Sequence, residues 1–190
     1  MDNRRGLINF SVTLFLTFAS PFALAQDAPP DDAARLDQLF AELANADPDQ
    51  ASRIEGQIAT LWSKSGSAAM DLLLRRGEDA LEAGEHQAAL EHFSALVDHA
   101  PDFAEGYNGR ATAYYLLGLT GPALEDIRRA LALNPRHFGA MRGFGIVLEE
   151  LERPDQALEV YRAILALHPH AEGVADAVTR LEVSLEGQSL

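Results

Sequence analysis

The stretch PDFAEGYNGRATAYYLLGLTGPALEDIRRALALNP, residues 101–135, decides the fold of this chain of 190 residues. It runs from Pro101 to Pro135, and Pro169 follows after the same interval of 34 residues. Each interval repeats one order of small, bulky and proline residues. The small positions are Gly77, Ala111 and Gly145, then Ala89, Ala123 and Ala157, and the bulky positions are Phe93, Ile127 and Tyr161. A frame of this length and order predicts an array of helical hairpins.

These positions have physical roles in a pair of antiparallel helices. Small residues let two backbones approach, and the bulky residue fills the space between neighbouring helices. Gly84 and Gly118 permit a tight turn, and the prolines end each second helix because their ring cannot continue the hydrogen-bond ladder. The first helices are expected at about 70–83, 104–117 and 138–151, and the second helices at about 87–99, 122–133 and 155–167.

Residues 70–171 resemble three tandem tetratricopeptide repeats (TPRs). The resemblance rests on Gly77, Gly84, Ala89, Phe93 and Pro101, on Tyr107, Ala111, Tyr114, Gly118, Ala123, Ala130 and Pro135, and on Gly145, Leu148, Ala157, Tyr161 and Pro169. Three copies in one frame make this signal specific, whereas a single copy would be a weak signal because alanine-rich helices are common. The resemblance implies an all-α fold, an α-solenoid of antiparallel helix pairs with repeats at 70–103, 104–137 and 138–171.

The third copy departs from the frame at its turn. Glu152 stands where the other two copies have glycine, and Arg153-Pro154 follows it. The next repeat position, three residues after the bulky one, is small in the second copy, Ala130, and large in the others, Leu96 and Ile164. We therefore expect uneven packing between successive units and a less regular superhelix at the third turn.

The first 25 residues have the pattern of a secretory signal peptide. Arg4 and Arg5 form a positive start, an apolar run spans 7–19, and Ala23-Leu24-Ala25 is a small–x–small cleavage motif. The alternative is an uncleaved membrane anchor, but the apolar run is short for a bilayer span. The pattern predicts export and cleavage before Gln26, with the bacterial periplasm as the destination.

The repeats are flanked by two further helical regions. Residues 26–32 are acidic and proline-containing, which predicts an extended linker. Residues 33–67 predict a repeat-like helical hairpin without the repeat positions, placed to cover the exposed apolar edge of the first repeat. Its apolar stripes are Leu36, Leu39, Phe40 and Leu43, then Ile54, Ile58, Leu61 and Trp62. Residues 172–186 predict an amphipathic capping helix at the C-terminal end.

Composition and motifs exclude several function classes. The net charge of −14 argues against binding to nucleic acid and against adsorption to anionic lipid. The chain has no cysteine, which excludes disulfides, thiol catalysis and cysteine-ligated zinc. No nucleophile–base order, phosphate loop or HExxH pattern occurs, and the carboxylates are spread over helix faces. We therefore expect no enzyme activity, no cofactor and no metal site.

Three polar or aromatic features have both a functional and a structural interpretation. Arg110 is either an anion-binding residue or the partner of Asp126, and a half-buried arginine favours the carboxylate pair. Trp62 is either a ligand-stacking residue or part of the core, and its apolar stripe favours the core. His168 and His170 flank a proline, and without helical ligand spacing we expect surface residues rather than a metal site.

The resemblance implies that the first helix of each repeat lines a concave surface that receives peptides or helices. Helical phase places on that surface Leu74, Glu78, Leu81, Asn108, Thr112, Tyr115, Arg142, Ile146 and Glu149. Asn108 can both donate to and accept from a peptide backbone, Tyr115 offers a ring, and Arg142 can bind a carboxylate. The chaperone-binding type of repeat clamps a terminal carboxylate with lysine and asparagine. Leu74 and Glu78 stand in the first unit instead, so that clamp is not expected.

The sequence thus predicts a non-enzymatic adaptor or scaffold in the bacterial envelope. Its partner-binding residues are expected to be Glu78, Asn108, Thr112, Tyr115, Arg142 and Glu149. The partner is expected to be a protein or peptide, and the chain itself a monomer or weak homo-oligomer. Two alternatives are a self-associating structural protein and an enzyme or ligand-binding protein on a helical scaffold, which would need a deep pocket with perturbed ionisable groups.

Overall fold

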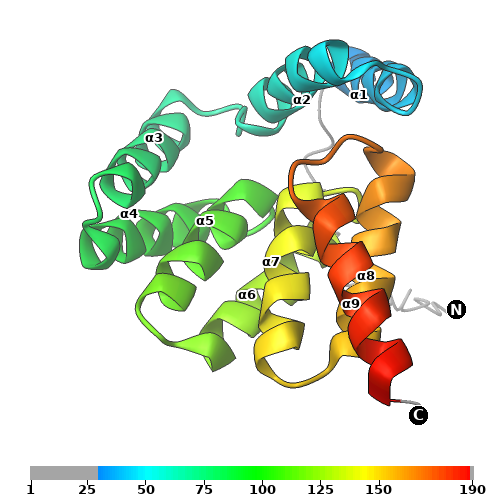
Figure 1. Ribbon diagram of the computed structural model, residues 1–190. Helices are drawn as coiled ribbons and strands as arrows, with labels where there is room; N and C mark the ends of the chain where they lie inside the picture. The colour runs from blue at the N-terminus through cyan, green and yellow to red at the C-terminus, as the bar shows by residue number, and fades with distance from the viewer. Residues whose placement is uncertain (1–29, 189–190) are drawn as a thin grey trace, which may run out of the picture.

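The computed structural model describes residues 30–188, and this part of the chain is all-α (Figure 1). Its helices are α1 Pro30–Leu43, α2 Pro48–Trp62, α3 Ala68–Glu82, α4 His86–His99, α5 Ala104–Leu116, α6 Thr120–Leu133, α7 Phe138–Glu150, α8 Pro154–Leu167 and α9 Val174–Gln188. Helices α3 to α8 form three antiparallel pairs, each within two residues of the predicted ranges. The predicted α-solenoid of helix pairs is confirmed. The predicted signal peptide, 1–25, lies outside the described residues.

Helix α1 begins inside the segment that was expected to be an extended linker. It starts at Pro30, so within residues 26–32 the linker prediction is wrong from that residue onward, and residues 26–29 lie outside the described range. Proline suits the first turn of a helix because the N–H that it lacks would have no intrahelical acceptor there. The sequence pattern weighed the proline as a helix breaker and missed this position.

The bulky positions of the repeat pack against glycines on two helices. The Phe93 ring of α4 is fully buried and lies between Gly77 of α3 and Gly109 of α5, so closely that a Cβ atom at either glycine would overlap the ring. Tyr161 of α8 covers Gly145 in the same manner. The glycines therefore set the distance between helices, as the small positions of the frame predict.

The turns between the two helices of each repeat share one backbone geometry. The second residue after the first helix has a left-handed φ in all three units: 73° at Gly84, 75° at Gly118 and 56° at Glu152. Each turn closes with an N–H to C=O bond from the next residue to a residue five positions earlier, at 2.8, 2.9 and 2.9 Å. This is the Schellman arrangement, which favours glycine. The third turn keeps the geometry although a glutamate occupies its strained position.

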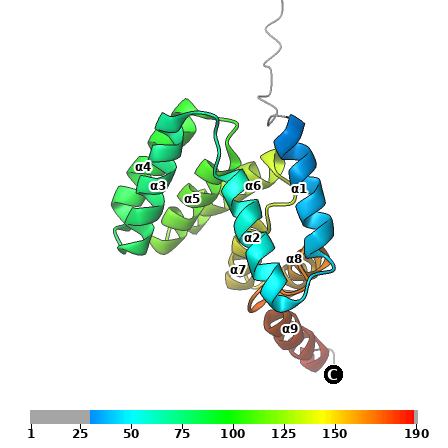
Figure 2. The same ribbon diagram turned by 90° about the horizontal axis from the view of Figure 1, so that it is seen from above.

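The N-terminal hairpin packs against the third repeat, so the prediction that it covers the first repeat is wrong. Phe40 of α1 and Trp62 of α2 lie 6.5 and 5.0 Å from the ring of Phe138 at the start of α7. Asp37 of α1 pairs with Arg136 at 2.7 Å. Figure 1 shows the hairpin lying across the ends of the repeat helices, and Figure 2 shows it from above.

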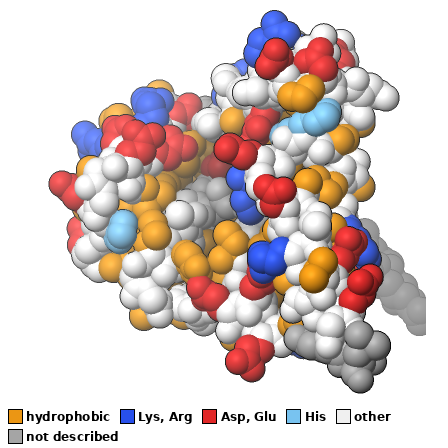
Figure 3. Space-filling model, viewed as in Figure 1, with side chains coloured by type: hydrophobic (Ala, Val, Ile, Leu, Met, Phe, Trp, Pro, Cys, Tyr) orange, Lys and Arg blue, Asp and Glu red, His pale blue; other side chains and the backbone are white. Residues whose placement is uncertain are grey.

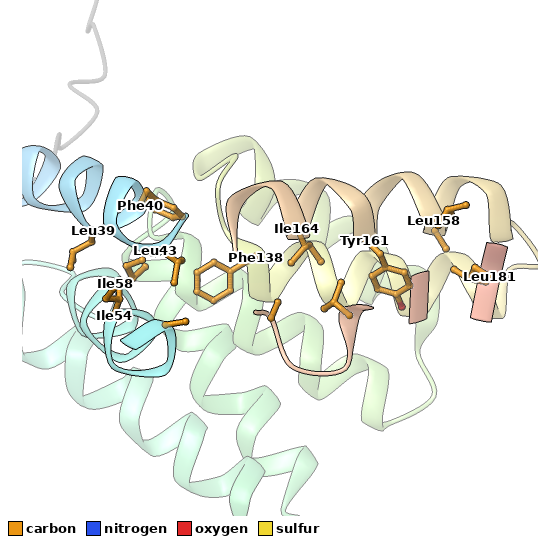
Figure 4. Close-up of a cluster of buried hydrophobic side chains, with 14 of the residues drawn as sticks. Leu39, Phe40, Leu43, Ile54, Ile58, Phe138, Leu158, Tyr161, Ile164 and Leu181 are labelled. Carbon is orange, nitrogen blue, oxygen red and sulfur yellow. The ribbon is translucent and has the colours of Figure 1, made fainter. Parts of the chain in front are cut away.

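One continuous core joins the hairpin to the C-terminal half of the array (Figure 4). Its buried members are Leu39, Phe40, Leu43, Ala51, Ile54, Ile58, Phe138, Leu148, Ala157, Leu158, Tyr161, Ile164, Ala171, Val174 and Leu181. The core of the first repeat, which includes Leu74, Phe93 and Ala113, is a separate cluster. The apolar stripes of the hairpin are buried against the third repeat. The turn after Trp62, with Gly66 at φ 81°, changes the direction of the chain between the hairpin and the first repeat.

Helix α9 caps the C-terminal end. It packs along α8 and buries Leu181, while Arg162 of α8 pairs with Glu182 of α9 at 2.6 Å. The predicted capping helix is confirmed, with Gly173 at φ 71° in the turn before it. Within residues 30–188, no helix combines the length and the apolar content that a bilayer span requires.

Candidate functional site

Helices α3, α5 and α7 stand side by side and line the inner face of the array. Figure 3 shows this face as a hollow, with hydrophobic side chains on its floor and both acidic and basic side chains along its edge. We call it the concave groove and define it by Glu78, Asn108, Thr112, Tyr115, Arg142 and Ile146.

Three residues that helical phase placed on this surface are engaged elsewhere. Leu74 is only 2% exposed and belongs to the core of the first repeat, and Leu81 packs against that core. Glu149 accepts two hydrogen bonds from Arg180 of α9, at 2.6 and 3.0 Å, and one from the Tyr161 hydroxyl at 2.9 Å. The prediction that Leu74 lies on the concave surface is therefore wrong, because Leu74 is a core residue. Glu149 binds the capping helix α9 through Arg180.

The contacts among Glu149, Arg180 and Tyr161 shift the pKa values of all three side chains. The hydrogen bonds from Arg180, and secondarily the one from Tyr161, lower the pKa of Glu149 against the opposing effect of burial. The same carboxylate raises the pKa of Arg180 through its hydrogen bonds. Burial, followed by the bond to Glu149, raises the pKa of the Tyr161 phenol. The three shifts favour an ionised Glu149, an ionised Arg180 and a neutral Tyr161. These three side chains therefore have a structural role: they hold α9 against α7 and α8.

The centre of the groove is braced between two repeats. Tyr115 of α5 donates a hydrogen bond of 2.5 Å to Glu150 of α7, and this bond is the main reason that the pKa of Tyr115 is raised. Thr112 donates to the backbone carbonyl of Asn108 at 3.0 Å, within its own helix. The Tyr115 ring stays half-exposed and keeps a face toward the groove.

Arg142 and Asn108 retain unused hydrogen-bonding capacity. Both side chains are half-buried. The Nε atom of Arg142 is fully buried and has no acceptor among the described residues, and this guanidinium forms no ion pair within 30–188. Buried donors in folded proteins normally have a partner, so Arg142 is an unsatisfied cation whose side chain would have to turn before its Nε met an acceptor from outside the chain.

The α3 end of the groove is acidic. Burial, followed by repulsion from Glu105, Asp79 and Glu82, raises the pKa of Glu78, and Arg75 opposes this only weakly. Among the described residues Glu78 has no cationic partner at ion-pair distance. The carboxylates of α3 and the first turn of α5 thus face the same space without a compensating charge.

His137 and Glu105 form a contact that the sequence pattern missed. The Nδ1 atom of His137 accepts the backbone N–H of Ala140 at 3.1 Å, which places the ring proton on Nε2. Nε2 then lies 3.0 Å from Glu105, and the imidazole stacks on Trp62 at 4.7 Å between ring centroids. The only signal in the sequence was the position of His137 just before a helix, where a side chain can cap the first turn.

A second opening adjoins the acidic end. This hairpin cleft, of about 890 Å³, lies between the hairpin, the start of α3 and the α4–α5 turn, and its walls include Trp62, Met70, Phe103 and Glu105. Trp62 packs on the core and is half-buried, so the core interpretation holds, with one edge at the cleft. Glu105 is the residue that the cleft shares with the acidic end of the groove.

The predicted arginine–carboxylate pair is confirmed. Asp126 accepts two hydrogen bonds from Arg110, at 2.7 and 2.8 Å, and these bonds raise the pKa of Arg110. The Arg110 guanidinium also lies 5.6 Å from the ring centre of Tyr107. Arg110 is therefore a structural residue that joins α5 to α6, and it is not free to bind an anion.

The expectation of two surface histidines is half wrong. His170 is exposed, but His168 is 1% exposed, with its Nε2 atom 3.2 Å from Glu55 of the hairpin. It is buried because the hairpin covers the turn after α8. Among residues 30–188, no three histidine, aspartate or glutamate side chains gather as a metal-ion cluster would require.

Comparison with known proteins agrees with this architecture. The tetratricopeptide repeat family model matches residues 74–121 and 122–172. A TPR repeat-containing protein of Rhizobium etli is 33% identical over 163 residues, which span 85% of this chain and 80% of that protein. Tetratricopeptide repeat protein 36 of Bos taurus is 37% identical over 107 residues, 54% of this chain and 55% of its own length.

Solved structures share the fold at low sequence identity. The first TPR of Spaghetti (RPAP3), bound to the HSP90 peptide SRMEEVD, superposes with a TM-score of 0.59 at 22% identity, covering 62% of this chain and 93% of that one. The Sgt2 TPR domain of Aspergillus fumigatus gives 0.60 at 19% identity, covering 65% and 83%. The family match and the shared fold agree with the three repeats in the structure: this chain belongs to the tetratricopeptide repeat family.

Proposed function

We propose that the protein is a non-enzymatic adaptor of the bacterial envelope that binds a segment of a partner protein in its concave groove. The observation that carries this proposal is the half-buried guanidinium of Arg142, which forms no ion pair among residues 30–188 and whose Nε has no acceptor there. A bound segment that offers a carbonyl or carboxylate oxygen would satisfy it. The half-buried amide of Asn108 is available to the same segment from the neighbouring helix.

The repeat family supports a protein or peptide as the partner. The RPAP3 repeat domain was solved with an HSP90 peptide, and the TPR2B domain of yeast Sti1 was solved in a complex with pHsp70. Open solenoids bind extended segments along such inner faces. The groove of this chain also lacks a nucleophile–base arrangement, which favours binding over catalysis.

The envelope location rests on the leader pattern in residues 1–25, with Arg4, Arg5 and the motif at Ala23-Leu24-Ala25. To test it, the full-length gene would be expressed in its bacterial host and the cells fractionated. We expect the protein in the periplasmic fraction, with an N-terminus at Gln26 by mass spectrometry. An intact N-terminus in the cytoplasmic fraction would contradict the location without touching the groove.

Site-specific photo-cross-linking in living cells tests the groove. A photoreactive amino acid would replace Thr112 in the groove or, as the control, Glu125 on α6, whose side chain is 79% exposed. We expect Thr112 to give an adduct with a partner, and the double variant Tyr115→Ala, Arg142→Glu to lose it while keeping its helicity. Equal adducts from both positions, or adducts from Glu125 alone, would refute the groove as the binding surface.

Self-association remains a second candidate because one edge of the array exposes leucines. Leu116, Leu117 and Leu119 surround the α5–α6 turn, and Leu151 occupies the position of Leu117 in the next repeat, with exposures between 36% and 46%. This candidate predicts that particle size grows with concentration in light scattering. It also predicts that Leu117→Gln with Leu119→Gln abolishes the growth, whereas changes at Tyr115 and Arg142 leave it intact.

A further inference from the structure

The concave groove contains several carboxylates, and their charge limits which kinds of ligand can bind there. At its α3 end, Glu78 and Glu82 of α3 face Glu105 of α5, and the repulsion among these carboxylates contributes to the raised pKa of Glu78. Glu150 of α7 adds a further carboxylate beside Tyr115. These carboxylates come from three different helices, so the negative charge of the groove arises only when the three repeats are assembled.

The acidic groups lack internal compensation. Arg110 is held by Asp126, and Arg75 opposes the raised pKa of Glu78 least of all the contributing groups. Arg76 is exposed and is not among the groups that shift this pKa. The Nε2 atom of His137 lies 3.0 Å from the Glu105 carboxylate. Glu78 is exposed, and a cation from outside would offset the repulsion that it experiences from its neighbouring carboxylates.

Exposed apolar side chains occur on the other two helices of the groove. Ile146 of α7 and Leu116 of α5 are 38% and 45% exposed, and the half-buried Tyr115 ring lies in the same groove. Figure 3 shows hydrophobic side chains on the floor of the hollow, with acidic side chains and some basic ones along its edge. The surface therefore matches a ligand that has apolar side chains on one side and positive charge beside them.

We infer that the occupant of the concave groove is a cationic amphipathic protein segment, with lysine or arginine side chains against Glu78 and Glu105 and apolar side chains on Tyr115 and Ile146. This inference rests on the proposed function and specifies its partner class. Arg142, the groove cation, takes a carbonyl oxygen of the same segment through its half-buried guanidinium. The chain as a whole, at net charge −14, attracts such a segment and repels acidic ones.

The expected preference is opposite in charge to the ligand in the RPAP3 structure. That peptide, SRMEEVD, has three acidic residues and one basic residue. Here the α3 end would meet such a peptide with further carboxylates, and like charges at an interface cost binding free energy. The same fold thus selects a different ligand class through the residues on its inner face.

Three short fluorescent peptides provide the test. They share one set of alternating leucines and carry lysine, glutamine or glutamate at all polar positions, and their affinities for the full-length gene product would be measured by fluorescence anisotropy. We expect the lysine peptide to bind roughly tenfold more tightly than the glutamine peptide at low salt, and the glutamate peptide most weakly. High salt should reduce the difference.

A matched pair of variants localises the effect. Glu78→Gln with Glu105→Gln removes two groove charges, and glutamine at 105 still offers His137 an acceptor. Glu125→Gln with Glu159→Gln removes two charges from exposed positions on α6 and α8. We expect the first pair to abolish most of the lysine preference and the second to leave it unchanged. Equal losses in both pairs would show that only net charge matters and would overturn the inference.

The remaining outcomes separate this inference from the proposed function. Failure of the lysine peptide to bind, or equal binding of all three peptides, would overturn the inference. If the segment that cross-links to position 112 in cells is acidic or neutral, the groove function stands and the charge class is wrong. If position 112 gives no partner adduct at all, the groove function itself fails.

Discussion

Phe93 of α4 lies against Gly109 of α5, with no room for a side-chain carbon at that glycine. The opposite neighbour of the ring is Gly77 of α3, and the ring is fully buried between the two. One aromatic side chain thus fixes the spacing of the first repeat's own helices and its spacing from the second repeat. The consequence is that the ring cannot move away from a substituent on either side.

Gly109→Ala should therefore destabilise the protein although alanine favours helix. A methyl group at this position overlaps the Phe93 ring, and overpacking of this kind typically costs about 1–3 kcal/mol of unfolding free energy. Gly143→Ala is the matched control, because it occupies the same repeat position and its Cβ would lie 3.6 Å from Ile127, an ordinary contact. It should be neutral or stabilising by up to about 1 kcal/mol. Chemical denaturation followed by circular dichroism compares the two, and equal effects would contradict the sandwich.

Glu152→Gly should stabilise the third turn. Glu152 is the one residue other than glycine with positive φ among residues 30–188, at 56°, and this conformation costs a side-chain-bearing residue roughly 1–2 kcal/mol. Glycine also gains entropy in the unfolded chain, so a net gain of about 0.5–1 kcal/mol is expected in thermal denaturation. Gly118→Ala in the equivalent turn should lose a similar amount. A stability loss in the Glu152 variant would mean that its side chain has an energetic role.

The pairing of Glu149 with Arg180 predicts a stability contribution that acid removes. Because the pKa of Glu149 in the folded chain is below the ordinary glutamate value of 4.5, the stabilisation is present above pH 4.5 and is lost as the pH falls through the lowered pKa. Glu149→Gln should therefore cost about 1 kcal/mol at neutral pH, and less in acid. Glu159→Gln on α8 is the control. A cost that does not change with pH would contradict the charged pair.

Glu78 should behave in the opposite way. Its pKa is raised above 4.5 in the folded protein, so its ionisation disfavours folding, and stability is lost as the pH rises from 4.5 through the raised pKa. Glu78→Gln should accordingly stabilise the free protein at neutral pH and have little effect in acid, as measured by denaturation at several pH values. A stabilising change that also weakens binding of the lysine peptide would identify Glu78 as a binding residue rather than a folding residue. A destabilising effect at neutral pH would contradict this view.

The repeat frame predicted the local structure because its signals are local. The intervals between Pro101, Pro135 and Pro169 predicted the helix pairs, and the carboxylate of Asp126 was found from its phase relative to Arg110. These contacts join residues within one repeat. Periodicity describes such contacts well, because it fixes which side of each helix a residue occupies.

Contacts between distant segments could not be predicted in the same way. The apolar stripe around Phe40 fits any exposed apolar edge, and nothing in its spacing selects the third repeat over the first. Glu149 was placed in the groove by phase alone, but Arg180, 31 residues later, draws it toward the capping helix. The pairing of His137 with Glu105 also crosses from one repeat to the next. Each depends on where whole helices dock, which is information that a single sequence pattern does not contain.

The docking of the hairpin on the third repeat leads to the last prediction. Trp62 stacks on His137 at 4.7 Å and lies 5.0 Å from Phe138, so Trp62→Ala removes the main aromatic contact across this interface. The cost should be below the about 3–5 kcal/mol that is typical of a packed core, because Trp62 is half-buried. Hydrogen exchange should become faster in α1 and α2. It should stay unchanged in α3 and α4, because the core of the first repeat is a separate cluster. Leu72→Ala, at an exposed position of α3, should change neither. Faster exchange in α3 and α4 of the Trp62 variant would mean that the hairpin stabilises the first repeat, as the sequence pattern alone had suggested.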